Sequence, residues 1–183
     1  MKFIHIALGA LILAPSAALG QSNAGAGPPA PCASPEYRQL DLWVGEWTAS
    51  WKNADGTTGT GKNRITRDEY GSCVLTERFS MDQGGFRGFS ISMYVKAAGE
   101  WRQTWMDNQG GYFDLYGGPA LVPGAAFALE TYRRKPEAPF RQMLWQDVKP
   151  DSFTWRWRGK DKADDAWKDL WVIQYTRAKG AAR

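Results

Sequence analysis

W-R-Q-T-W-M-D-N-Q-G-G-Y-F-D-L-Y-G-G, residues 101–118, is the stretch of the sequence that decides the fold. Aromatic residues alternate with other residue types in residues 101–107 and again in 112–116, and the segment between them ends in Gly110 and Gly111. Alternation with a period of two is typical of β-strands, and a glycine-rich turn between two such segments predicts a β-hairpin. The chain after Leu42 repeats this pattern with different side chains.

The repeated pattern predicts about ten β-strands. We expect them at residues 43–51, 62–67, 73–81, 88–96, 101–107, 112–116, 127–133, 140–147, 152–158 and 167–177. Segments rich in Gly, Pro, Asp or Lys separate the strands, and the chain after Trp43 shows no sustained helical period. Short connections between successive strands favour an all-β, up-and-down antiparallel barrel of the lipocalin-like kind. A β-sandwich is the alternative.

A short N-terminal helix is expected just before the barrel. Ser34 is suited to cap a helix and Pro35 to occupy its first position, so a helix should begin there and end at about Leu42. A helix of barely two turns needs tertiary packing to exist. The barrel domain is therefore predicted at residues 35–178.

The first residues of the chain have the features of a secretory signal peptide. Lys2 precedes an apolar run at residues 3–15, and the small residues before Gln21 suit cleavage at that point. We predict a signal peptide at residues 1–20, a flexible linker at 21–34, and a periplasmic or secreted protein without stable membrane insertion after cleavage. An uncleaved membrane anchor is the alternative.

The charge and the histidine content exclude several classes of function. Removing residues 1–20 leaves 22 basic and 19 acidic residues, a net charge of +3, with no run of five basic residues. A nucleic-acid partner is therefore not expected. The only histidine is His5, inside the predicted signal peptide. This excludes Ser-His-Asp and Cys-His catalysis and His-ligated metals from the mature chain, and we expect no cofactor and no metal.

Cys32 and Cys73 are the only cysteines of the chain. In an oxidising compartment a disulfide between them would pin the N-terminal segment to a strand and contribute about 3–4 kcal/mol. A free reactive thiol is the alternative, although neither cysteine lies in a C-x-x-C arrangement. We predict the disulfide.

Alternation also predicts which side chains point into the barrel. The inward set is Trp47, Ala49, Trp51, Leu75, Glu77, Phe79, Phe89, Ile91, Met93, Trp101, Gln103, Trp105, Met143, Trp145, Phe153, Trp155, Trp157, Trp171, Ile173 and Tyr175. A shift of one residue would invert any strand, and in residues 89–95 the alternate face of Ser90, Ser92 and Tyr94 would suit a polar cavity. Arg156 and Arg158, which alternate with the inward Trp155 and Trp157, should face solvent.

The sequence resembles an uncharacterised bacterial family of secreted or periplasmic proteins that carry a domain of unknown function. The resemblance lies in W-R-Q-T-W-M-D-N-Q-G-G at residues 101–111, preceded by Gly88-Phe89-Ser90, and extends over almost the whole mature chain. The Gly-x-Trp at Gly45 and Trp47 also resembles the opening of lipocalin-type barrels. The resemblance implies a lipocalin-like barrel and no established reaction. In such barrels a last-strand arginine stacks on this tryptophan, a role that Arg177 would take.

Ten tryptophans are more than a modest core requires, which favours an aromatic-lined pocket over a filled core. Glu77 and Gln103 are the polar exceptions on the inward face and would orient a small apolar or aromatic ligand. The residues expected to bind the ligand are Glu77, Gln103, Trp105, Trp145, Trp155 and Tyr175.

Three other interpretations of the same residues stay open. Glu77 would instead form an internal bridge with Arg64, Arg141 or Arg177. Alternatively the barrel is a histidine-free lyase, isomerase or cyclase, in which Glu77 is the acid or base beside an arginine and a tyrosine, Tyr94 or Tyr175. The third interpretation is an envelope interaction module with a filled core.

Overall fold

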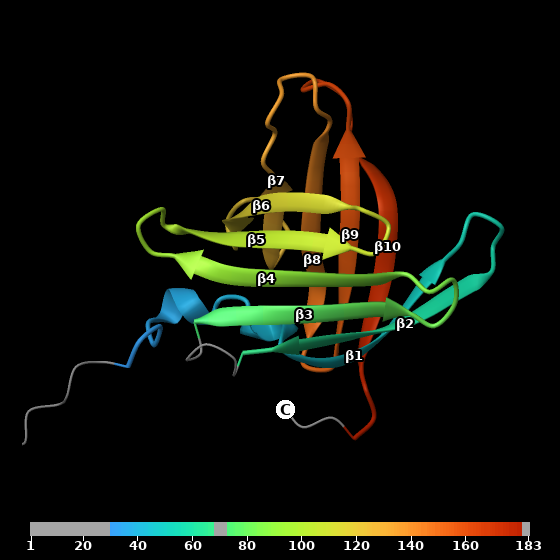
Figure 1. The fold of residues 1–183 in the computed structure, drawn as a ribbon, viewed down its shortest axis with the longest axis horizontal. Helices are drawn as coiled ribbons and strands as arrows, with labels where there is room; N and C mark the ends of the chain where they lie inside the picture. The colour runs from blue at the N-terminus through green and yellow to red at the C-terminus, as the bar shows by residue number, and fades with distance from the viewer. Residues whose placement is uncertain (1–29, 68–72, 181–183) are drawn as a thin grey trace, which may run out of the picture.

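The computed structural model describes residues 30–67 and 73–180, in which ten β-strands close into one barrel (Figure 1). The strands are β1 (Gly45–Lys52), β2 (Thr58–Thr66), β3 (Val74–Met81), β4 (Arg87–Val95), β5 (Glu100–Asp107), β6 (Tyr112–Gly118), β7 (Phe127–Thr131), β8 (Phe140–Lys149), β9 (Ser152–Lys160) and β10 (Lys168–Arg177). Each strand pairs antiparallel with the next one along the chain, and β10 pairs with β1. The predicted all-β antiparallel barrel is confirmed, and the β-sandwich is excluded.

Two short 3-10 helices precede the barrel, η1 (Pro35–Arg38) and η2 (Asp41–Trp43). They replace the single helix expected up to Leu42, because the segment is too short to hold a regular α-helix. Leu40 and Trp43 are fully buried in the core. The helical segment thus packs against one end of the barrel and anchors there through side chains that sequence reasoning had placed in a helix and a strand.

Most strands present the predicted face to the interior, and β4 does not. Ser90 and Ser92 are buried, whereas Ile91 is 43% exposed and Met93 is 40% exposed. The predicted inward set of Phe89, Ile91 and Met93 is therefore wrong. The reason is register: Ser90 lies directly opposite Glu77 of β3, and residues opposite each other in an antiparallel pair share one face.

The disulfide between Cys32 and Cys73 is confirmed, with a Cα–Cα distance of 5.1 Å. It ties the segment before η1 to the residue that precedes β3, and it is compatible with a secreted or periplasmic protein. The predicted signal peptide at 1–20 and most of the predicted linker lie outside the described residues. Over residues 30–67 and 73–180, no helix has the length and apolar character needed to cross a membrane.

Arg177 closes the barrel between its last and first strands. Its guanidinium lies 4.2 Å from the centre of the Trp47 ring, so the predicted stacking is confirmed. Arg177 also donates hydrogen bonds to Asp151 Oδ1 at 3.0 Å and to the Pro150 carbonyl at 2.9 Å. Gly45 has a φ of +136°, and a Cβ there would overlap the guanidinium. The absence of a side chain at Gly45 therefore allows the stack to form.

We expect Arg177→Met to lower the free energy of unfolding by about 1–3 kcal/mol, because it removes the stack on Trp47 and the hydrogen bonds to Asp151 and Pro150. Arg64→Met is the matched control, since Arg64 pairs with Glu46 at 3.5 Å on an exposed face. There the loss should stay below about 1 kcal/mol. Urea unfolding of both variants measures the difference. Equal losses would show that Arg177 has no special role in closure.

Candidate functional site

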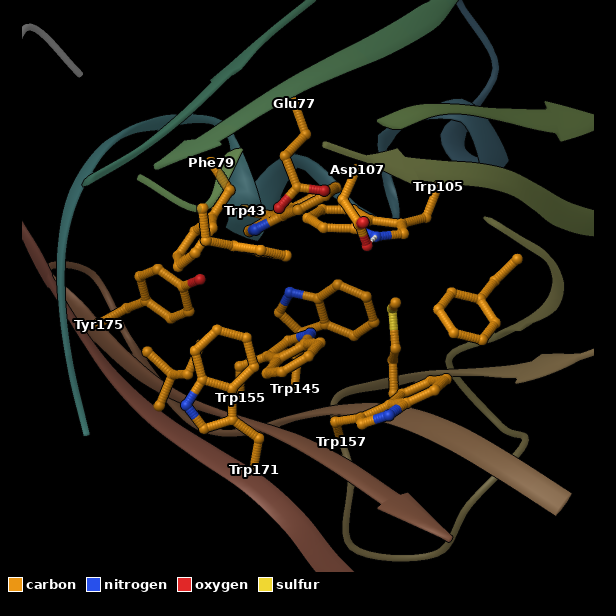
Figure 2. Close-up of a pocket in the computed structure, with 14 residues that line it drawn as sticks. Trp43, Glu77, Phe79, Trp105, Asp107, Trp145, Trp155, Trp157, Trp171 and Tyr175 are labelled. Carbon is orange, nitrogen blue, oxygen red and sulfur yellow. Dashed lines mark hydrogen bonds between the residues drawn. The ribbon is translucent and has the colours of Figure 1, made fainter. Parts of the chain in front are cut away.

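A cavity of about 180 Å³ lies inside the barrel (Figure 2). Its lining residues are Trp43, Glu77, Phe79, Phe86, Trp105, Asp107, Phe113, Met143, Trp145, Trp155, Trp157, Trp171, Ile173 and Tyr175. Trp43 of η2 lies at the closed end of the barrel. The cavity extends towards the end formed by the turns after β3, β5 and β9, where Phe86, Asp107 and Trp157 are only partly buried. The site is thus an interior space with one more accessible end.

Tryptophan rings form most of the wall. Trp43 meets Trp145 edge to face at 5.3 Å between ring centres, and Trp155 meets Trp171 in the same way at 6.1 Å. Edge-to-face packing of large, stiff rings leaves gaps that smaller side chains would fill. The tryptophans therefore surround a space instead of filling it.

Gly88 allows Trp105 to lie against the wall at the accessible end. A Cβ on Gly88 would overlap the six-membered ring of Trp105. The same indole stacks near-parallel on Phe86, with 6.4 Å between ring centres. A flat aromatic surface at this end therefore depends on the glycine next to it in β4.

Glu77 is the buried acid of the site, with 7% of its surface exposed. Its Oε1 accepts a hydrogen bond from Asn63 Nδ2 at 2.7 Å, and its Oε2 accepts one from Ser90 Oγ at 2.6 Å. Burial raises the pKa of Glu77 to about 7, although the bonds from Ser90 and Asn63 act in the opposite direction. The side chain is therefore close to half protonated at neutral pH.

A row of polar side chains supports Glu77 on four consecutive strands. This polar row consists of Asn63 on β2, Glu77 on β3, Ser90 and Ser92 on β4, and Gln103 on β5. Gln103 Nε2 donates to Ser92 Oγ at 3.0 Å and to Ser90 Oγ at 3.3 Å. The row fixes the position of Ser90, and through it the orientation of the Glu77 carboxyl group.

The polar row also contacts Tyr175 of β10, a strand that only β1 separates from β2. Asn63 Nδ2 donates to the Tyr175 hydroxyl at 3.3 Å. Burial, with a contribution from the nearby Glu77 charge, keeps the pKa of Tyr175 well above its usual value, so this phenol stays neutral. Asn63 Oδ1, Gln103 Oε1 and Trp145 Nε1 are buried and make no hydrogen bond within the described residues.

Asp107 is a second carboxylate at the accessible end. Burial acts to raise its pKa, but hydrogen bonds from Trp105 Nε1 and from the backbone N–H groups of Gly111 and Gln109 outweigh it, so the pKa of Asp107 is lowered. Trp105 Nε1 lies 3.1 Å from Asp107 Oδ2. Asp107 is therefore ionised at neutral pH and also shapes the β5–β6 turn. Figure 2 shows both carboxylates on the side of the cavity opposite Trp155 and Trp171.

The structure brings most of the predicted site residues to the cavity. Those that line it are Glu77, Trp105, Trp145, Trp155 and Tyr175. Gln103 points inward but lies behind Ser90 and does not line the space. Trp155 and Trp157 point inward, as predicted. Tyr94, the alternative tyrosine, packs against Tyr37 and Trp101 instead.

The predicted arginine bridge to Glu77 is wrong. Arg64 pairs with Glu46, Arg141 donates to backbone carbonyls at Phe140 and Lys160, and Arg177 binds Asp151. The partners of Glu77 are neutral donors, Asn63 and Ser90. Sequence reasoning missed both. Ser90 lay on the alternate face considered for β4, while Asn63 had no signal beyond its alternation with Ile65.

Within the described residues, no group of three or more His, Cys, Asp or Glu side chains comes together as a metal site. The cavity lining likewise offers only two carboxylates, a phenol and a thioether as polar atoms apart from indole N–H groups. The chemistry open to the site is therefore recognition by aromatic surfaces and carboxylates, or proton transfer through Glu77.

Comparison with known proteins leaves the family open. No family model matches the chain, and no curated protein matches it, so the resemblance to a family of secreted proteins stays a prediction. Among solved structures, the crystal structure of Rv2717c from M. tuberculosis matches 80% of this chain and 99% of its own, with a TM-score of 0.49 and 13% sequence identity.

The raised pKa of Glu77 predicts a loss of stability as pH rises. Between the unfolded value of 4.5 and the folded value of about 7, the folded chain binds more protons than the unfolded chain. The free energy of unfolding should therefore fall by about 3 kcal/mol between pH 4.5 and pH 8, relative to Glu77→Gln, in which this linkage is absent. Urea unfolding at both pH values measures it. Parallel pH profiles for the two proteins would contradict a raised pKa.

Proposed function

We propose that the protein binds one small apolar or aromatic molecule inside the barrel. The observation that carries this proposal is the cavity of about 180 Å³, whose walls are mostly aromatic rings. Glu77 lies in this cavity as a buried acid and forms no ion pair among the described residues. An apolar cavity of roughly 150 Å³ in a protein core is large enough to bind benzene. A molecule with one aromatic ring is therefore the appropriate size.

The proposed roles follow from position. Trp105, Trp145 and Trp155 form walls whose aromatic rings give the ligand a large apolar surface to pack against. Glu77 and Tyr175 supply polar contacts at the inner end, and Gln103 acts indirectly, because it holds Ser90 against Glu77. A few polar groups in a mostly apolar space are the usual composition of small-molecule sites.

We also propose that the protein acts in the periplasm or outside the cell. The apolar run at residues 3–15 and the Cys32–Cys73 disulfide support this location. An extracytoplasmic carrier or receptor of small molecules would fit both features. The cavity weighs against the interaction module with a filled core.

Filling part of the cavity should weaken binding while the tryptophans, Glu77 and Tyr175 stay unchanged. Ile173→Phe adds an aromatic ring inside the cavity, and we expect it to weaken binding of toluene or 4-methylphenol at least tenfold. Val172→Phe is the matched control, because the neighbouring side chain points to the outside of the same strand and should leave the affinity unchanged. Calorimetric titration and tryptophan quenching measure both. Equal affinities in the two variants would place the ligand elsewhere.

A histidine-free enzyme is the second candidate, and the pKa of Glu77 near 7 favours it, since a base poised at neutral pH serves proton transfer. Tyr175 lies close by, whereas no arginine lines the cavity, so the arginine role in this alternative is dropped. A carboxylate in a water-poor aromatic space is a stronger base than a carboxylate in water.

The probe 5-nitrobenzisoxazole tests this basicity. The Glu77 carboxylate would remove the proton on C3 while the N–O bond breaks, which yields the coloured 2-cyano-4-nitrophenolate. We expect the rate to rise with pH, to reach half of its maximum at a pH of about 7, where half of Glu77 is ionised, and to level off at higher pH; in Glu77→Gln it should fall to the solution level. Glu46→Gln, on the exposed face, should retain the full rate. A rate that is the same in both variants would refute a basic role for Glu77.

A further inference from the structure

The charged residues that line the cavity are all acidic. Two of its lining residues, Glu77 and Asp107, are carboxylates, and none is Lys or Arg. The chain as a whole has more basic than acidic residues, 23 against 19. Elsewhere in the described chain arginines pair with carboxylates on the outer surface, as in Arg134 with Asp114 at 2.9 Å. The two carboxylates that line the cavity thus have no basic side chain beside them in its wall.

The walls add to the negative electrostatic potential. Six tryptophans line the cavity, together with Tyr175 and three phenylalanines. Each aromatic ring has a negative face, and indole has the strongest interaction with a cation. Carboxylates inside a tryptophan-lined space are the combination with which proteins recognise ammonium groups, particularly those whose charge is spread over methyl or methylene groups.

The polar row leaves Glu77 able to accept more bonds. Each carboxylate oxygen accepts one hydrogen bond, from Asn63 or from Ser90, and a carboxylate has about four acceptor positions. Both donors are neutral. Glu77 is therefore oriented by its neighbours while its charge remains without compensation inside the cavity.

We propose that the ligand is an organic cation, a small alkyl- or arylammonium ion whose charge lies next to Glu77 and whose apolar part lies against the tryptophans. This inference rests on the proposed function, because it names the class of molecule that the cavity binds. A neutral molecule would use the aromatic walls but leave the buried acid without a counterion. An anion would meet two carboxylates and the negative faces of the rings.

The cation also explains how the site tolerates an ionised Glu77. The titratable groups that share the cavity with Glu77 are Asp107 on β5, which stays ionised, and Tyr175 on β10, which stays neutral; Asn63 of β2 and Ser90 of β4 do not titrate. Below the pKa of Glu77, cation binding must release its proton. Cation affinity therefore rises with pH, opposite to the affinity expected for a ligand that accepts a hydrogen bond from a protonated Glu77.

The test compares phenyltrimethylammonium with tert-butylbenzene, which has the same shape without the charge. Calorimetric titration at pH 8 should show the cation binding at least tenfold more tightly than the neutral molecule. The preference should shrink at pH 5.5, where Glu77 is protonated, and disappear in Glu77→Gln. Glu46→Gln removes the same charge from an exposed position on β1 and should keep the preference.

The outcomes separate this inference from the proposed function. Equal binding of the two molecules, or tighter binding of tert-butylbenzene, overturns the cation assignment and leaves an apolar-ligand site intact. Binding of neither molecule overturns both. If Glu77→Gln fails to fold, the pH series on the unaltered protein decides: a cation preference that does not weaken between pH 8 and pH 5.5 contradicts the role of Glu77.

Discussion

β10 pairs with β1 over four residues, from Trp47 opposite Arg177 to Ser50 opposite Gln174. This pairing converts a meander of antiparallel strands into a closed surface, so every inward side chain must share one interior. Barrel diameter grows with the number of strands, and about eight strands already give an interior that side chains can fill. With ten strands in the described chain, the interior is wider, and even tryptophans leave a space. The cavity is thus a consequence of closure at this size.

The two ends of that interior are filled differently, so the cavity is more accessible at one end than at the other. At the η2 end, Leu40 and Trp43 are buried, and Trp47 donates through Nε1 to the Trp43 carbonyl at 2.8 Å while Arg177 covers its ring. At the other end the strands are joined by turns alone. Six of the ten tryptophans line the cavity, so most of the tryptophans of the chain form its walls.

The fold class could be predicted from the sequence because period-two alternation and turn residues are local signals. The same alternation predicted the inward position of Glu77 between Leu75 and Phe79. Local signals could not predict which face of β4 points into the barrel. Either face of β4 could point into the barrel on the sequence pattern alone, and only the pairing with β3 places Ser90 beside Glu77. An apolar residue such as Ile91 therefore stays partly exposed while a serine is fully buried. Hydrophobicity alone predicts the opposite.

The hydrogen-bond partners of Glu77 could not be predicted from the sequence for a related reason. An arginine partner is the default expectation for a buried carboxylate, because it removes the penalty of an isolated charge. The described chain instead surrounds Glu77 with an amide and a hydroxyl, donors that orient the acid and leave its charge uncompensated. Such an arrangement disfavours folding at any pH at which Glu77 ionises.

Residues that reduce stability and yet are held in place by a dedicated hydrogen-bond network are characteristic of binding and catalytic sites. In this barrel the polar row extends over four strands to position one carboxyl group, and Tyr175 of β10, which lies on the other side of β1, joins it. A core built only for stability would fill the same volume with aliphatic side chains. Closure thus provides the space, the tryptophans provide its walls, and the polar row makes Glu77 the one oriented acid at its inner end.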